Sequence, residues 1–145
     1  MKKMMFLVLA IATFAILPAC ADDIVIPVKK LPNLAQEFLN THFAGSSVVK
    51  AIHDRDINDN DYTVWLSDGS KVEFNSKGKW ESVENKKSNV PDSVVPTSIK
   101  EYVTTNYPSL AIVKIEQNIY GYEVELTNDL DLRFDSNGNF VGLDD

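Results

Sequence analysis

The stretch YTVWLSDGSKVEFNSKGKW, residues 62–80, decides the fold because a second stretch, YEVELTNDLDLRFDSNGNF at residues 122–140, follows the same pattern. Both alternate apolar and polar residues, which is the period of a β-strand with one buried face. Tyr62, Val64, Leu66, Phe74, Ser76 and Gly78 align with Tyr122, Val124, Leu126, Phe134, Ser136 and Gly138. The shared residues are mostly of buried types, so the repetition concerns the fold and carries no catalytic set.

The repetition extends upstream, where LPNLAQEFLNTHF (31–43) aligns with VPTSIKEYVTTNY (95–107). Each segment has apolar residues at helical spacing and a proline suited to the start of a helix. The upstream segments align at an offset of 64 residues and the downstream stretches at 60, so the first copy has four extra residues. They fall within 54–61, where a hairpin loop would accept them.

The alternating pattern predicts four strands after each helix. They are expected at 48–53, 62–67, 71–75 and 79–83, and again at 111–117, 122–127, 130–135 and 139–143. Asp68-Gly69 is a two-residue hairpin signal, and the non-periodic segment 86–96 joins the copies. The predicted class is α+β, with two tandem α-β-β-β-β repeats that form one continuous antiparallel sheet with both helices packed on one face. The repeats span 22–88 and 89–145 and share one structural domain.

The N-terminus MKKMMFLVLAIATFAILPACADD predicts export, with residues 1–21 as a signal peptide. Two cleavages remain open. Ala19-Cys20-Ala21 fits an ordinary cut before Asp22, which we favour, whereas Leu17-Pro18-Ala19-Cys20 resembles a lipoprotein box that would leave an acylated Cys20. Nothing after residue 23 is apolar for long enough to cross a bilayer. Cys20 is the single cysteine, so we expect no disulfide.

The charge of the chain restricts its partners. The formal net charge is −7, and it becomes −9 without Lys2 and Lys3 of the signal peptide. Such a chain repels nucleic acid and anionic lipid, and it attracts basic proteins, cationic peptides and metal ions. We therefore expect no nucleic-acid partner.

The motifs resemble a known family. The order Leu-Pro, helix, Tyr-x-Val-x-Leu, Asp-Gly-type turn, then Phe-Asn/Asp-x-x-Gly-x-aromatic, given twice after a signal peptide, is similar to the PepSY-like secreted proteins of Gram-negative bacteria, also described as β-lactamase-inhibitor-like. The resemblance spans residues 24–145. It implies tandem α+β units and a location in the periplasm, at the outer membrane or at the cell surface. The related inhibitor binds an enzyme with the open face of its sheet, but no inhibitory residues match here. Asn128-Asp129 lacks the turn glycine, so we expect a longer or strained hairpin there.

Residues for catalysis are sparse. His42 and His53 are the two histidines, and ordinary polar positions are favoured over a shared site. The sequence has no Ser-His-Asp or Cys-His set, no glycine-rich phosphate loop and no cysteine zinc motif. We expect a protein that is not an enzyme and needs no cofactor.

The densest acidic segment is DRDINDND, residues 54–61. Alternating oxygen ligands, Asp54, Asp56 and Asn58, could hold calcium. An EF-hand requires glycine at the sixth position and glutamate at the twelfth, where this chain has Asp59 and Trp65. A polar hairpin loop without a tight calcium site is the favoured interpretation.

The open face of the sheet is the predicted binding surface. We expect it to carry an exposed tryptophan ringed by charges and to grade from an aromatic-basic half to an acidic half. Its candidate binding residues are Trp65, Ile52, Lys50, Lys71, Glu73, Glu123 and Glu125. The first functional hypothesis is an exported, non-catalytic module that binds an envelope protein or peptide through this face. The alternatives are an inhibitor or regulator of an envelope peptidase or β-lactamase, and a calcium-dependent envelope protein.

Overall fold

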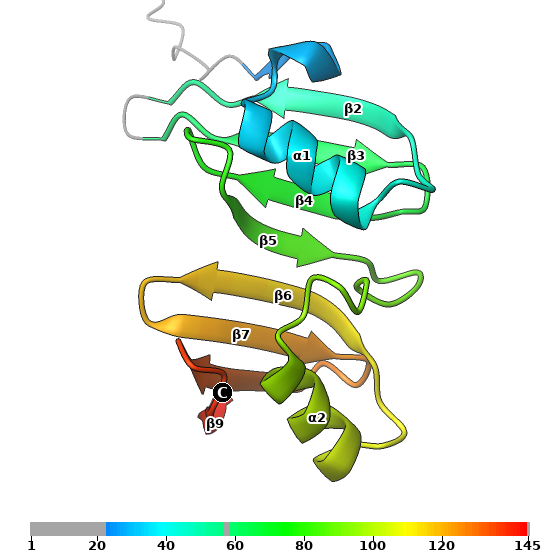
Figure 1. Cartoon of the computed structure of the whole chain (residues 1–145), viewed down its shortest axis with the longest axis vertical. Coiled ribbons are helices and arrows are strands. Elements are labelled where there is room, and N and C mark those ends of the chain that lie inside the picture. The colour runs from blue at the N-terminus through cyan, green and yellow to red at the C-terminus, as the bar shows by residue number, and fades with distance from the viewer. Residues whose placement is uncertain (1–22, 57–58, 145) are drawn as a thin grey trace, which may run out of the picture.

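The computed structural model describes residues 23–56 and 59–144, which form one nine-stranded antiparallel sheet (Figure 1). Each interior strand pairs with the strand before it and the strand after it in the chain. The strands are β1 (Ile24–Val25), β2 (Val48–His53), β3 (Tyr62–Leu66), β4 (Lys71–Phe74), β5 (Trp80–Glu84), β6 (Ile112–Asn118), β7 (Gly121–Leu126), β8 (Asp131–Asp135) and β9 (Phe140–Asp144). All eight predicted strands are confirmed to within a residue or so, whereas β1 was not predicted.

Two helices lie on the same face of this sheet, α1 (Asn33–His42) over the first strands and α2 (Thr97–Asn106) over the last (Figure 1). A short 3₁₀ helix, η1 (Val28–Lys30), precedes α1. Pro32 and Pro96 directly precede the two helices, where the backbone amide that proline lacks would have no helical partner. The order of one helix followed by four strands therefore occurs twice, in an N-terminal half (α1, β2–β5) and a C-terminal half (α2, β6–β9).

The core lies between the helices and the sheet, and aromatic rings anchor each helix to it. Phe38 of α1 meets Phe74 edge-on, with ring centroids 5.7 Å apart, and stacks on Trp80 at 5.8 Å. In the C-terminal half, Tyr102 of α2 meets Phe134 edge-on at 5.4 Å and stacks on Phe140 at 4.6 Å. Both ring arrangements are favourable ones. Not every apolar residue at helical spacing is buried, because Leu34 of α1 is 57% exposed.

Two turn glycines also position the helices. Gly78 has φ +83° and Gly138 has φ +80°, a region that side chains rarely adopt. A Cβ on Gly78 would lie 2.6 Å from Cβ of Pro32, and one on Gly138 would overlap the Ser98 hydroxyl. Each β-turn therefore supports the first turn of a helix, which explains why glycine stands at both positions.

The two halves are joined through paired strands and a buried polar network. Val83 of β5 pairs with Ile115 of β6, so the sheet continues across the junction. The segment 86–96, predicted as a connection without periodicity, contributes three buried valines to the core: Val90, Val94 and Val95. At its start, Asn85 is 2% exposed and accepts hydrogen bonds from the amides of Lys87 and Ser88. The connection is thus part of the core.

The hairpin between β7 and β8 has Asp129 at the turn position that Gly69 occupies in the hairpin between β3 and β4. The Asp129 amide donates to the Leu126 carbonyl, as the Gly69 amide donates to Leu66 in the equivalent turn. Asp129 takes a φ of 63°, which aspartate tolerates better than most residues. This turn therefore has the same length as its counterpart, so the longer hairpin did not form. Of the two expected outcomes, the structure has the second, a non-glycine residue in the left-handed backbone region.

Candidate functional site: the open face of the sheet

Strand register brings all seven candidate binding residues onto the face opposite the helices, in two rows that cross the sheet. One row of paired positions runs through Lys50, Trp65, Lys71, Glu84, Lys114, Glu125, Asp131 and Asp144. The adjacent row runs through Ile52, Thr63, Glu73, Ser82, Glu116, Glu123 and Arg133. Neighbouring members of a row are close enough for their side chains to interact. The rows define what we call the open face.

Trp65 is the aromatic centre of this face in the N-terminal half. The ammonium nitrogen of Lys50 lies 5.5 Å from the centroid of the Trp65 ring, which is within the range of a cation–π interaction. Trp65 is only partly exposed. Ile52, in the adjacent row, is 8% exposed, so the expectation that it offers accessible apolar surface is wrong. Its paired neighbours Val25 and Thr63 flank it in the sheet, and β1, which the sequence did not predict, supplies the former.

Ion pairs change the expected distribution of charge. Lys71 pairs with Glu73 at 2.5 Å, and Lys114 pairs with Glu116 at 2.7 Å. Both pairs join residues two apart on one strand, which share a face. Lys71 therefore does not make the N-terminal half basic, and the predicted grading from a basic to an acidic half is wrong in that part. The spacing of lysine and glutamate could have revealed both pairs.

Carboxylates cluster on the C-terminal half of the open face. Burial raises the pKa of Glu123, and repulsion from Glu116, Asp144 and Asp131 raises it further. The pKa of Asp131 is raised by burial first and by Glu125 next. The pKa of Lys114 is also raised, because its hydrogen bond to Glu116 and the surrounding carboxylates outweigh the effect of burial. Mutual repulsion of this kind marks a negative potential that a cationic partner would relieve.

A second group of carboxylates lies at the β2–β3 end of the N-terminal half. Burial raises the pKa of Asp61, and Asp59, Asp54 and Glu73 add repulsion. The pKa of Glu81 is raised in the same way, by burial first and by repulsion from Asp61 next. Glu81 was not among the predicted site residues, and it lies where the pairing of β4 with β5 shifts register. The open face is therefore acidic at both ends.

The loop considered for calcium includes the start of this acidic group. The Asp54 amide donates to the Asp61 carbonyl, which closes the base of the loop. The Oδ1 atom of Asp54 is shielded from solvent and has no hydrogen-bond partner. Asn58 lies outside the described residues. Within residues 23–56 and 59–144, no three His, Cys, Asp or Glu side chains are grouped to hold a metal ion.

Each histidine has its own partners. His42 Nδ1 lies 2.8 Å from the Ser93 hydroxyl, and burial lowers the pKa of the imidazole. His53 Nε2 lies 2.6 Å from Asn60 Oδ1, and its ring stacks on Tyr62 with centroids 4.4 Å apart. Both histidines therefore occupy structural positions in separate parts of the fold.

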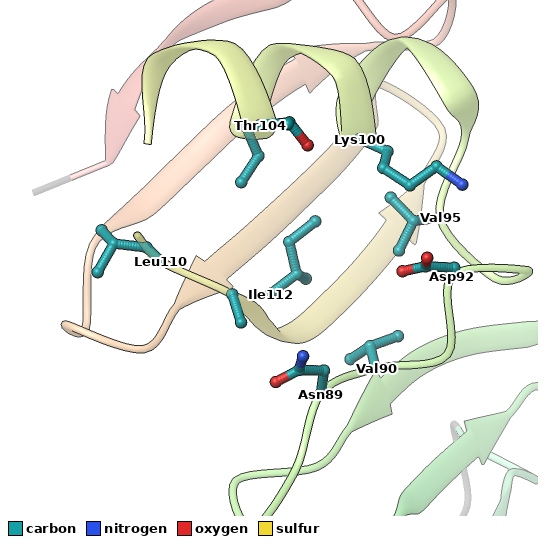
Figure 2. Close-up of a pocket in the computed structure, with 10 residues that line it drawn as sticks. Asn89, Val90, Asp92, Val95, Lys100, Thr104, Leu110 and Ile112 are labelled. Carbon is teal, nitrogen blue, oxygen red and sulfur yellow. The ribbon is translucent and has the colours of Figure 1, made fainter. Parts of the chain in front are cut away.

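A small pocket opens on the helix side of the sheet, between α2, segment 86–96 and the start of β6 (Figure 2). Val90, Val95, Leu110 and Ile112 contribute its apolar lining, and Lys100 and Asp92 lie at its margin. A similar pocket lies under α1, lined among others by Leu39, Asn40 and Val48. The first pocket offers one cation, one anion and a threonine hydroxyl, which do not form a nucleophile–base set.

Three comparisons place these features among known proteins. The family described as "Putative beta-lactamase-inhibitor-like, PepSY-like" matches residues 59–142. No curated protein matches the chain.

Solved structures resemble it over most of its length. A "putative calcium-regulated periplasmic protein" of Bacteroides thetaiotaomicron is 41% identical, with a TM-score of 0.81 over 85% of this chain and 97% of that one. A "putative periplasmic protein" of the DUF2874 family from Bacteroides vulgatus is 43% identical, with a TM-score of 0.78 over 86% of this chain and 98% of that one. A third, from the same species and described as of unknown function, is 39% identical, with a TM-score of 0.80 over 86% and 100%.

Proposed function

The chain belongs to the PepSY-like, β-lactamase-inhibitor-like family, and from that premise we propose that it is a non-catalytic module that binds an envelope protein or peptide through the open face of its sheet. One observation carries the proposal. Both helices cover one face, so the opposite face stays open across the sheet, with the Lys50–Trp65 pair on it. A partly exposed aromatic side chain among charged groups is typical of the centre of a binding surface.

The charges indicate how a partner would lie on this surface. Glu116, Glu123, Asp131 and Asp144 repel one another in the C-terminal half, so a basic region of the partner is best placed there. An apolar contact would form at Trp65, and Lys50 would remain at its rim. The candidate surface consists of Trp65, Lys50, Lys71, Glu73, Glu123 and Glu125, with Ile52 as a buried support.

Replacement of Trp65 tests this proposal. The wild-type chain is used to recover partners from an envelope extract, and each partner is then titrated against Trp65→Ala. We expect at least a 30-fold loss of affinity, because truncating a central aromatic residue costs about 2 kcal/mol or more. Leu34→Ala is the matched control, since Leu34 is 57% exposed on the helix side. Equal loss in both variants, or none in Trp65→Ala, would contradict the proposal.

The family description favours an enzyme as one class of partner. An inhibitor or regulator of an envelope peptidase or β-lactamase would use the same face, and it would be detected as a dose-dependent loss of enzyme activity. Loss of inhibition in Trp65→Ala would connect that activity to the open face. Absence of inhibition against both enzyme classes would leave the simple binding module.

Export is proposed from the N-terminal segment, which lies outside the described residues. The similar structures are described as periplasmic, and neither helix among residues 23–56 and 59–144 has the length and apolarity to cross a membrane. We place the mature chain in the periplasm or at the outer membrane, after removal of residues 1–21 or acylation of Cys20. Cell fractionation of wild type and Cys20→Ala separates these routes, because only a lipoprotein would leave the membrane fraction upon substitution.

We also propose that residues 22–88 and 89–145 are two copies of one unit within a single domain. The aromatic sets centred on Phe38 and Tyr102 support this, since their rings meet at the same positions and with similar angles. The pockets under α1 and α2 support it too, because Leu39 and Val48 in one correspond to Val103 and Ile112 in the other.

A calcium-dependent role is the second candidate, and the unpartnered Oδ1 of Asp54 favours it. A cation held by Asp54, Asp56 and Asn58 would supply that atom with a ligand bond, and carboxylate and amide oxygens suit calcium. The 41% identical protein described as calcium-regulated gives the idea further support. Millimolar calcium should then raise the melting temperature of wild type and not that of Asp54→Asn. The same response to magnesium, or no response, would contradict it.

A further inference from the structure

The two edges of the sheet differ in how they are protected. Edge β1 has two residues and is followed shortly by Pro27, and short edges and prolines both discourage the addition of another strand. Edge β9 has five residues, Phe140–Asp144, without proline or lysine. Among the described residues, β8 is its one strand neighbour. The outer backbone groups of β9 are therefore available for pairing in the part of the chain that the structure describes.

Strand β9 also exposes apolar side chains. Phe140 is 38% exposed, Val141 63% and Leu143 48%. Leu143 pairs with Leu132 and Phe140 with Phe134, so both project to the helix side. Val141 lies at a register shift and lines a shallow groove with Tyr120, Glu123 and Arg133. Exposed apolar surface of this kind on an edge strand is typical of a protein interaction site.

The β6–β7 hairpin adds apolar surface at the same end of the sheet. Ile119 and Tyr120 form its tip and are 86% and 82% exposed. Tyr120 shares the groove with Val141, so the tip is connected to the edge. Turn tips normally carry polar residues. Two large, exposed apolar side chains do not stabilise the turn itself, so they indicate contact with another molecule.

Charge distinguishes between the possible occupants. Asp144 pairs across the ladder with Asp131, and Glu123 lies two strands away. Burial raises the pKa of both Glu123 and Asp131, and repulsion within this group raises each of them further. The Arg133 guanidinium approaches Asp144 to only 3.7 Å. A second copy of this chain, with a formal net charge of −7, would bring more negative charge to the edge, whereas a basic strand would neutralise it.

We propose that β9 is a strand-addition site for an extended segment of another protein whose residues alternate between aliphatic and basic. Aliphatic residues of that segment would lie beside Phe140 and Leu143 on the helix side. Basic residues would lie beside Asp144 and Asp131 on the open face. Backbone hydrogen bonds to β9 would supply affinity, and the alternation would supply specificity. The site shares Asp131 and Asp144 with the acidic part of the open face but does not include Trp65, so substitutions of Val141 and Trp65 distinguish the two proposals.

A designed peptide tests the proposal directly. The probe is a fluorescein-labelled ten-residue peptide of alternating valine and lysine, titrated with the full chain and followed by anisotropy. We expect saturable binding that decreases at least tenfold for Val141→Lys and for Leu143→Lys. Val49→Lys is the matched control, because Val49 is 69% exposed on β2 at the other end of the sheet and should bind as wild type does. Circular dichroism melts confirm that each variant is folded.

Two further probes identify the mode of binding. A valine–glutamate peptide should bind at least tenfold more weakly than the valine–lysine peptide. Methylation of alternate backbone amides along one edge of the peptide should abolish binding, whereas methylation along its other edge should not, because one edge alone pairs with β9. Hydrogen exchange of the β9 amides should slow when peptide is bound.

The contrary outcomes are specific. No binding, equal binding by Val141→Lys, or indifference to both methylation patterns would overturn the proposal. Weaker peptide binding in Trp65→Ala with full binding in Val141→Lys would place the peptide on the open face, which supports the binding module and overturns the edge site. A doubling of mass in solution that Val141→Lys removes would identify a second copy as the occupant, which also overturns it.

Discussion

The side-chain amide of Asn85 donates a hydrogen bond to the Ser70 hydroxyl over 3.1 Å, and both residues are almost fully buried. The same amide lies 3.3 Å from the Asp68 carbonyl, and the side-chain oxygen accepts from the amides of Lys87 and Ser88. One side chain therefore holds the β3–β4 turn against the beginning of the segment that leads to the C-terminal half.

Asn85→Ala should destabilise the fold by about 2–3 kcal/mol, because it leaves several buried polar groups without partners. Urea unfolding followed by circular dichroism measures the change. Asn106→Ala is the control, since Asn106 is exposed and its side-chain amide donates to the Tyr102 carbonyl within its own helix. A loss in Asn85→Ala no larger than in Asn106→Ala would show that water replaces the network.

Phe74→Ala and Phe134→Ala should each cost about 3–5 kcal/mol, because both rings lie in the core at equivalent places. The paired strands β5 and β6 should make unfolding a single cooperative transition in both variants. Two separated transitions, each sensitive to one of the substitutions, would instead indicate two independent units.

Gly138→Ala should destabilise by about 1–2 kcal/mol or more, because alanine is strained at φ +80° and its Cβ would overlap the Ser98 hydroxyl. Gly78→Ala should behave in the same way against Pro32. Gly45→Ala is the matched control, since a Cβ there meets nothing within 4 Å. Thermal melts of the three variants measure the difference, and equal melting temperatures would show that the turns adjust freely.

Glu123→Gln should stabilise the protein at pH 7 and lose that advantage towards pH 4. The pKa of Glu123 is raised, so the folded chain keeps its proton at a pH where the unfolded chain has lost it. Stability should therefore rise as pH falls from the raised native pKa towards the ordinary value of 4.5. Melting temperatures at several pH values test this, with Glu101→Gln on α2 as the control. An advantage that is constant with pH would contradict it.

Much of the fold was readable from local patterns. The Asp68-Gly69 turn, the prolines before both helices and the period of two fixed the elements, because each depends on neighbours in the chain. The burial of Val90 was not readable, since its segment lies against β6, more than 20 residues further along the chain, where the Val90 amide donates to the Ile112 carbonyl. Ile52 looked accessible because β1 is only two residues long and has no detectable period of its own.

The candidate site was predictable as a face but less so as an electrostatic surface. Alternation placed Trp65, Lys71 and Glu123 on one side, and the register of the strands agrees. Some ion pairs join residues far apart in the chain and could not be predicted from spacing. In one of them, Nζ of Lys86 in the connecting segment lies 3.1 Å from Oε1 of Glu125 on β7. Glu81 was not predicted, because its repulsion by Asp61 and Glu73 depends on how separate strands and the β2–β3 loop come together.

The neighbour-to-neighbour order of the strands has a consequence for how the chain folds. Each strand pairs with the strand that precedes it in the chain. Most of the loops that must close are therefore short hairpins that cost little chain entropy, and the two longer connections contain the helices α1 and α2. A topology of such low contact order is expected to fold faster than most sheets of its size. The sheet can grow one strand at a time as the polypeptide emerges, without waiting for its far end.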